Sequence, residues 1–402
     1  MPNELQIQIE DLISKIEKQN KPYLARQIKQ NWNKTALSYS QELNNSWIPI
    51  MPMEEELEQA FNLELERLTI NEEKRSTILN SLKTKRVVQT GPHLGATENP
   101  RMLCINWLGS LGLGSEDFYV VAMFSGIPFS NSFHPGRINQ NTGSINLFSS
   151  SMQDALVYRS KIEKKLVETI DTLPKELKNL TPKADIGDSY TKWALQTCQN
   201  IERSILKKEN LIFLDLNEVV TNYLILVLKN TEHPLYKIFF DRNTQKEFIN
   251  IFPKETLFYT PIMSGKYEII ESFILEDGKL KSKNKEISLE NPDLLIEALK
   301  EERLCPALVT GFLGLAFINQ FKCLGSFRQV EYLPMYQKKL ANLACLKKFE
   351  IEKIPTENLT TGNFPANIDT YPIDILLGAK FTPNENTLFG ELLLPMKNML
   401  LK

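Results

Sequence analysis

Two of the three histidines in this 402-residue chain lie in turns that contain glycine. His93 lies in TGPHLG, directly after the β-branched run VVQ, and His134 lies in the segment SGIPFSNSFHPGR. That segment also contributes Ser125, Asn131 and Arg137. A histidine can move a proton near neutral pH, and an arginine can hold a carboxylate or phosphate through two hydrogen bonds. The two segments therefore predict a site that binds a small anionic molecule and transfers a proton.

Each of these residue types also has a structural interpretation. The His93 ring can donate to a backbone carbonyl within its own turn, and His134 can be an ordinary loop residue. His233 lies where a helix is expected to begin, and Cys104 lies on an apolar helix, so both are expected to be structural. The glycines of residues 90–95 allow backbone N–H groups to approach an anion. Because the segment is neither a P-loop nor a GxGxxG motif, a nucleotide cofactor is left open.

Alternating strands and helices are expected to position the two segments. Residues 87–90 and 118–124 have the composition of strands, and PRMLCINWLGSLGL between them has that of a helix. A second strand and helix are predicted within residues 211–230. This alternation is typical of a parallel sheet, whose ligands bind beyond the carboxyl ends of the strands. We therefore predict an α/β fold with a Rossmann-like parallel sheet and a site in the loops after its strands.

The rest of the chain is predicted to surround this core. Residues 1–85 carry apolar residues three or four positions apart, which is typical of helices, with Asn71 as an expected helix cap. Residues 151–180 are predicted to form an amphipathic helix, and residues 360–377 a loop followed by a short strand. Asp277-Gly278 predicts a β-hairpin. Three regions are expected: a helical region of residues 1–85, the Rossmann-like core of residues 86–256, and a mixed α/β region of residues 257–402 that completes the site.

Composition limits the class of protein. The formal net charge is −2, which favours neither nucleic acid nor an anionic membrane as a partner. The five cysteines form no CxxC pair, and no HExxH or GxSxG motif is present, so no metal site is expected. The longest apolar run, residues 307–318, is shorter than the roughly 20 residues that cross a bilayer. With no signal peptide at the N-terminus, a cytoplasmic protein is expected.

Two segments resemble the bacillithiol synthase family, whose members join cysteine to a glucosaminyl malate. VVQTGPHLG is similar to the nucleotide-fold signature of that family, although Pro92-His93 stands where the family has a glutamine pair. Residues 305–340 are similar to a stretch in which a proline-containing helix leads to a glycine pair, an acid and a tyrosine. The resemblance implies a Rossmann-like core with a helical appendage, and a site shared by residues 90–95, 125–137 and 325–332.

The last of these segments would add several polar groups to the site. Arg328, Gln329, Glu331 and Tyr332 offer a cation, an amide, an acid and a phenol. Such groups suit a small molecule that carries an amine and a carboxylate, such as an amino acid. The alternative is an ordinary amphipathic helix with Glu331 in solvent.

The leading hypothesis is a biosynthetic ligase or transferase that condenses or transfers a small amino-acid-like or sugar-derived metabolite without a bound metal. The expected catalytic residues are His93, His134 and Glu331. The expected substrate-binding residues are Thr90, Gly91, Ser125, Asn131, Arg137, Arg328, Gln329 and Tyr332. The alternative is a non-catalytic ligand-sensing or partner-binding protein that uses the helices of residues 1–85. The sequence leaves the oligomeric state open, a homo-oligomer included.

Overall fold

Helices form the start of the chain in the computed structural model, which describes residues 3–45, 47–114, 116–265 and 267–402. They are α1 (Glu4–Lys18), α2 (Pro22–Asn31), α3 (Ala36–Asn45), α4 (Glu55–Arg67) and α5 (Glu72–Lys85). The expected cap of α5 is confirmed, because the Asn71 side chain accepts a hydrogen bond of 2.9 Å from the Lys74 backbone N–H. Within the described residues, no helix has the length and apolar character needed to cross a membrane.

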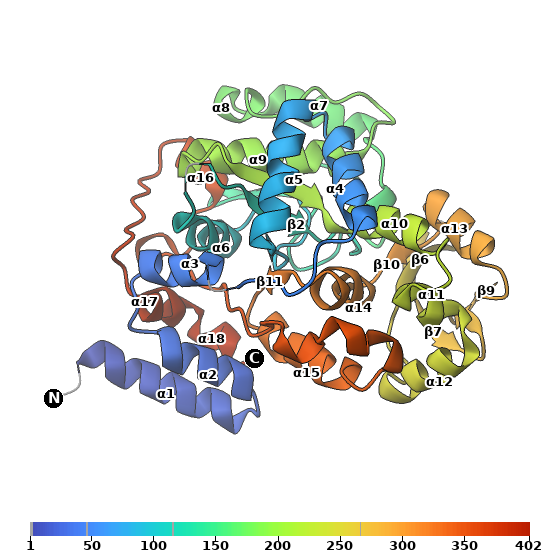
Figure 1. Cartoon of the computed structure of the whole chain (residues 1–402). Helices are drawn as coiled ribbons and strands as arrows, with labels where there is room; N and C mark the ends of the chain where they lie inside the picture. The colour runs from blue at the N-terminus through green and yellow to red at the C-terminus, as the bar shows by residue number, and fades with distance from the viewer. Residues whose placement is uncertain (1–2, 46, 115, 266) are drawn as a thin grey trace.

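A four-stranded parallel sheet lies at the centre of the molecule (Figure 1). Its strands are β1 (Val87–Gln89), β2 (Tyr119–Met123), β5 (Leu211–Asp215) and β11 (Lys322–Leu324), in the order β11-β1-β2-β5. Every residue of the four strands is buried, which explains why most of them are apolar or β-branched; the exceptions are Gln89, Asp215 and Lys322. The predicted α/β class and parallel sheet are thus confirmed. The strand at residues 322–324 was not predicted.

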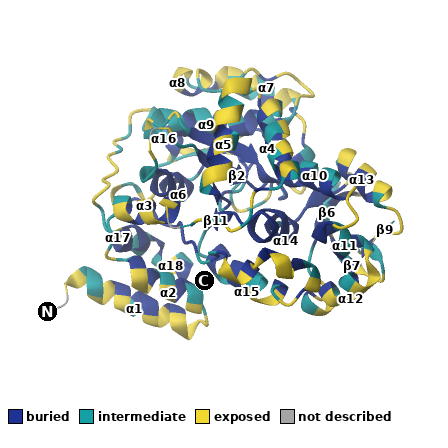
Figure 2. Cartoon of the chain, in the orientation of Figure 1, coloured by how far each residue is buried: buried dark blue, intermediate teal, exposed yellow. Residues whose placement is uncertain are grey.

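Helices cover this sheet and form the connections between its strands. α6 (Pro100–Leu111) packs on β2, and α9 (Tyr190–Leu206) packs on β5. α10 (Leu216–Val227) begins directly after β5, and α14 (Leu308–Phe312) continues into a π-helical segment, Leu313–Ile318, that contacts β11. Figure 2 shows α6 and α14 among the most deeply buried parts of the chain. Their apolar composition on all sides follows from this position.

The strands of a second, antiparallel sheet lie between β5 and β11 in the sequence. Its order is β10-β6-β7-β8-β9. The expected hairpin at Asp277-Gly278 is confirmed, and both residues have the positive φ angles, 49° and 74°, that a tight hairpin turn requires. The strands are β6 (Phe258–Ser264), β7 (Tyr267–Glu276), β8 (Lys279–Lys281), β9 (Glu286–Ser288) and β10 (Cys305–Pro306), and a separate hairpin joins β3 (Arg137–Gln140) to β4 (Gly143–Asn146).

Two predicted elements are wrong. Residues 151–180 contain the 3₁₀ turns Ser150–Met152 and Val157–Arg159 and the short helices α7 (Lys164–Thr172) and α8 (Lys175–Lys178). Pro174 separates these helices, because the residue before a proline disfavours helical backbone. The expected strand near residue 377 is the helix α16 (Pro372–Leu376), which Pro372 begins.

The remaining helices complete the C-terminal half of the molecule. They are α11 (Pro234–Phe240), α12 (Arg242–Ile251), α13 (Pro292–Lys300), α15 (Gln329–Leu340), α17 (Phe389–Leu393) and α18 (Lys397–Leu400), with 3₁₀ turns at Ala344–Phe349, Ile351–Lys353, Pro365–Asn367 and Leu394–Met396. His233 caps α11, as expected for a histidine at a helix entry, by accepting a hydrogen bond from the Leu235 backbone N–H.

Candidate functional site

Loops from three strands meet at the carboxyl edge of the parallel sheet. Residues 90–95 follow β1, residues 125–137 follow β2 and residues 325–332 follow β11. The side chains of Thr90 and Gln329 bond to each other, with 2.9 Å between Gln329 Nε2 and Thr90 Oγ1. The strand order explains this meeting, because β11, β1 and β2 are neighbours that run in the same direction.

Gly91 allows the first and third of these loops to approach closely. A Cβ atom at this position would lie 3.3 Å from the Ser326 backbone nitrogen and 3.1 Å from Gln89 Oε1. The Gly91 N–H donates to the same Gln89 oxygen over 2.9 Å. Thr90 and Gly91 therefore join two loops, and neither residue lines a pocket described below.

His93 supports the loop after β2. Its Nδ1 atom lies 3.3 Å from Asn131 Oδ1, and its ring centre lies 4.5 Å from that of Phe133. Asn131 Oδ1 also accepts the Phe133 backbone N–H over 3.1 Å. Burial lowers the pKa of His93, and the Asn131 hydrogen bond offsets part of this effect. The imidazole is therefore neutral at pH 7, and it positions residues 131–133.

The main cavity near these loops lies at the start of α6. This α6 pocket has a volume of about 460 Å³ and is lined by Asn99–Arg101, by residues of the loop and strand after β2, and by residues of the C-terminal segment 363–399. His134 and Arg137 line it, and both also line a neighbouring pocket of about 320 Å³. Phe133, whose ring also contacts that of His93, is part of the same wall.

The α6 pocket carries two arginines that form no ion pair within the described residues, although the charge of Glu98 acts on Arg101. Among the described residues, Arg101 and Arg137 form no ion pair, and Arg101 Nη1 instead lies 2.9 Å from Met399 Sδ. The Arg101 guanidinium also lies 5.9 Å from the centre of the Phe133 ring. Asp369 adds an exposed carboxylate to the lining. The pocket can therefore receive a carboxylate or phosphate at the guanidinium groups and an amine at Asp369.

The first turn of α6 contributes little to anion binding in the pocket beyond the helix dipole. Its backbone N–H groups at Arg101 and Met102 are already bonded to Asn99 Oδ1, over 3.0 and 3.1 Å. Free N–H groups are what usually make a helix start an anion site. The arginine side chains are therefore the groups that would bind an anion here.

His134 has an unusual backbone for a non-glycine residue. Its φ angle is +51°, and the conformation is held by the hydrogen bond of 2.7 Å from its N–H to the Asn131 carbonyl. Non-glycine residues adopt this region rarely, and such residues cluster at functional sites. Partial burial lowers the pKa of His134, and the positive charge of Arg137 lowers it further. The ring is therefore neutral at pH 7 and can accept a proton from a molecule in the α6 pocket.

Residues 328–332 do not line the α6 pocket. The Glu331 carboxylate accepts the Leu24 backbone N–H over 2.7 Å and so caps the start of α2. It is partly buried and, within the described residues, forms no hydrogen bond with either predicted histidine. Tyr332 packs against Phe312 and Tyr336, with ring centres 5.9 and 5.6 Å apart. Arg328 is exposed, and its positive charge adds a smaller contribution to the lowering of the His93 pKa that burial causes.

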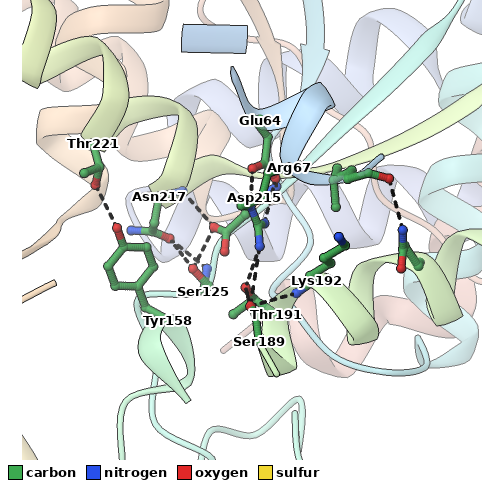
Figure 3. Close-up of polar contacts among 12 residues, drawn as sticks. Glu64, Arg67, Ser125, Tyr158, Ser189, Thr191, Lys192, Asp215, Asn217 and Thr221 are labelled. Atoms are coloured by element: carbon green, nitrogen blue, oxygen red, sulfur yellow. Dashed lines mark hydrogen bonds and ion pairs between the residues drawn. The ribbon is translucent and has the colours of Figure 1, made fainter. Parts of the chain in front are cut away.

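Ser125 belongs to a buried polar cluster at the ends of β2 and β5 (Figure 3). Its hydroxyl donates to Asp215 Oδ1 over 2.7 Å. Asn217 Oδ1 accepts the backbone N–H groups of Ser125 and Gly126, over 2.8 and 3.0 Å. Sequence reasoning missed Asp215 and Asn217, although an acid directly after the strand LIFL and before a helix is a recognisable cap signal.

The same cluster contains a paired glutamate and arginine from α4. Arg67 donates to both oxygens of Glu64, over 2.6 and 2.9 Å, and Glu64 Oε1 accepts the Asp215 backbone N–H over 2.9 Å. Asp215 Oδ2 has no hydrogen-bond partner among the described residues. Because Glu64, Ser125, Asp215 and Asn217 are fully buried, this cluster fixes the loops that carry the site and does not contact substrate.

Two buried acids, Asp215 of this cluster and the neighbouring Glu218 of α10, predict a pH dependence of the free energy of unfolding. Burial raises the pKa of Asp215 to about 7, with a further increase from Glu64, and burial raises the pKa of Glu218 to about 8. Unfolded carboxyl groups titrate near pH 4, so the folded chain binds more protons between about pH 4 and pH 8. The free energy of unfolding is therefore expected to fall as the pH rises through this range, by at most roughly 4–5 kcal/mol for each group.

Urea denaturation at several pH values measures this fall. Asp215→Asn removes one of the titrating groups and keeps the side-chain shape, so the variant is expected to lose less stability than the wild type between acidic and alkaline conditions. Equal pH dependence in the two proteins would show that Asp215 does not titrate as described.

Comparisons with known proteins do not assign a family to this chain. A scan against protein-family models finds no match, and a search of curated proteins finds no significantly similar sequence. The site therefore has to be interpreted from its own chemistry.

Proposed function

We propose that this chain is an enzyme that binds a small amino-acid-like metabolite in the α6 pocket and condenses or transfers it. The supporting observation is that three charged side chains and one neutral base line one cavity: Arg101 and Arg137, which form no ion pair among the described residues, Asp369, and His134 with its strained backbone. These groups complement a molecule with an anionic end, an amine and a proton to lose.

Each group has a role in this proposal. Arg101 and Arg137 hold the carboxylate or phosphate, and Asp369 holds the ammonium group of the incoming molecule. His134 accepts the proton that the nucleophilic amine or hydroxyl loses as its new bond to the acceptor forms. The acceptor carries a leaving group, whose bond to the acceptor breaks in the same reaction and which departs with the electron pair. His93 and Asn131 are positioning residues, because they fix residues 131–134 from behind Phe133.

The class of reaction follows from the resemblance to bacillithiol synthase. Residues 87–95 and 305–340 carry that resemblance, which supports a ligase or transferase on a Rossmann-like core, with an amino acid or an amino sugar as substrate. All five cysteines are free thiols, which supports a reducing compartment such as the cytoplasm.

A thermal-shift screen tests the proposed ligand class. Amino acids, amino sugars, sugar phosphates and small dicarboxylates would be added to the wild type and to Arg137→Ala. A ligand of the pocket stabilises the folded chain by RT ln(1 + [L]/Kd), so it is expected to raise the Tm of the wild type and to raise that of Arg137→Ala much less.

Arg303→Ala is the matched control, because Arg303 is a half-exposed arginine paired with Glu301 outside the pocket. It is expected to respond as the wild type does. A ligand that stabilises Arg137→Ala as much as the wild type would bind elsewhere, and a failure of every class would reject the proposed substrate chemistry.

The alternative function, partner binding through the helices of residues 1–85, has less support. Ile9, Leu12 and Ile16 on α1 are fully buried, and α1 contacts α2 and α17 of the same chain. This apolar face of α1 is therefore already covered, although Ile7, Ile48, Ile50 and Leu63 of the same region are exposed.

A further inference from the structure

Three metal-ligating side chains meet in the interior, outside the groups used above. Glu98 lies in the loop before α6, and Cys198 and Glu202 lie one turn apart on α9. One donor atom of each lies within 4.8 Å of the others, and all three residues are buried. A single ion with bonds of about 2.0–2.3 Å spans nearly this distance, so small movements would bring all three into coordination.

Several oxygen atoms at this cluster have no partner. Glu98 Oε1, Glu202 Oε1 and Asn106 Oδ1 form no hydrogen bond within the described part of the chain. The amide of Asn106 lies at the cluster, because its Nδ2 atom donates to Glu202 Oε2 over 3.0 Å. Asn106 and Glu202 are completely inaccessible to solvent, and Glu98 is 4% exposed. Unpartnered buried acceptors of this kind are rare in native proteins and require an explanation.

A proton cannot account for the whole arrangement. A proton shared between the two carboxyl groups joins two oxygens at most. The Asn106 oxygen would still lack a partner. In addition, the Glu98 backbone N–H donates to Cys198 Sγ, so the sulfur lies against the loop that carries Glu98. One divalent cation would pair with the thiolate, both carboxylates and the amide oxygen together.

We propose that Glu98, Cys198, Glu202 and Asn106 bind a divalent transition-metal ion. One sulfur donor among oxygen donors suits zinc, and four protein ligands in a closed, buried site are typical of structural zinc. Binding releases the Cys198 thiol proton to solvent as the metal–sulfur bond forms. The ion would tie α9 to the loop that leads into the α6 pocket, since Glu98 directly precedes Asn99 in the pocket lining.

The sequence analysis expected no metal, because the ligands come from distant segments. Cys198 and Glu202 have helical spacing and are visible as a pair, but Glu98 lies about a hundred residues earlier in the chain. None of these three residues belongs to a standard zinc-binding sequence motif. The fold alone brings them together.

Elemental analysis of the full-length chain, purified without chelator or histidine tag, tests the proposal. The wild type is expected to hold about one equivalent of metal, zinc foremost. Cys198→Ser and Glu202→Gln are expected to hold at least about tenfold less after dialysis. Cys104→Ser is the matched control, since Cys104 is a buried thiol on the same helix as Asn106 but outside the cluster, and it is expected to retain the metal.

A measurement on the wild type alone covers the case in which the variants fail to fold. The chain is refolded with Co²⁺, and a cobalt–thiolate charge-transfer absorption in the near ultraviolet is expected. Loss of this absorption band when Zn²⁺ displaces Co²⁺ would support the proposal. Absence of the band, together with no stoichiometric metal after refolding with Zn²⁺, Mn²⁺ or Fe²⁺, would overturn it. Full metal content in Cys198→Ser and Glu202→Gln would also overturn it.

Discussion

Arg67→Ala is expected to lower the free energy of unfolding by roughly 3–5 kcal/mol, because removal of one partner of a buried ion pair leaves an uncompensated charge. Arg67 binds both oxygens of Glu64, whose carboxylate is completely inaccessible. Asp215 and Glu218 are buried close by, and their charges interact with Arg67. Without the guanidinium, three acids would share this interior, and at least some would have to be protonated.

Urea denaturation measures the effect. Arg303→Ala serves as the comparison, because its ion pair with Glu301 is half exposed and such pairs contribute about 0–1 kcal/mol. The double variant Glu64→Leu with Arg67→Met replaces the pair by apolar groups of similar size and is expected to regain much of the lost stability. A loss of less than about 1 kcal/mol in Arg67→Ala would mean that the acids are neutral regardless of Arg67.

His134→Asn is expected to reduce turnover by about 10²–10⁴-fold, the range typical of a lost general acid or base. Asparagine is chosen because it tolerates the left-handed backbone that His134 adopts, so the loop conformation is kept. The substrate is the molecule identified by the thermal-shift screen, and steady-state kinetics give kcat and KM separately.

His93→Asn provides the contrast for this prediction. Because His93 acts through Asn131 and Phe133, its loss is expected to change kcat and KM together and by a smaller factor. The pH profile is expected to keep its shape in His93→Asn and to lose its acidic limb in His134→Asn. Unchanged turnover in His134→Asn would remove this histidine from the mechanism.

Local signals in the sequence were sufficient for most of the core. The apolar runs at residues 118–124 and 211–214 are short and contain β-branched and aromatic residues, which favours strands, and Asn71 and Asp277-Gly278 act through their own backbone neighbours. Residues 151–163 were predicted as helix because they mix polar and apolar residues. In the structure they lack the continuous series of backbone hydrogen bonds that an α-helix needs. Residues 322–324 form a strand only because β1 lies beside them.

The candidate site was accessible to sequence reasoning only in part. His134 and Arg137 were identified because their residue types are rare and chemically active in a glycine-containing loop. Arg101 and Asp369 were missed because they reach the α6 pocket from a helix start and from the C-terminal segment, and nothing local marks them. Glu331 was misplaced for the converse reason, since its role depends on the start of a helix far away in sequence.

The position of β11 in the sheet has a consequence for the order of folding. β1 pairs with β2, a near neighbour in sequence, and with β11, which is synthesised far later. During translation the backbone of β1 therefore presents an open edge until residues 322–324 leave the ribosome. Non-local parallel pairing of this kind is slow, and unpaired edges attract other chains. Protection of this edge by a chaperone, or by the N-terminal helices packed nearby, would decide how much of the nascent chain reaches the native state.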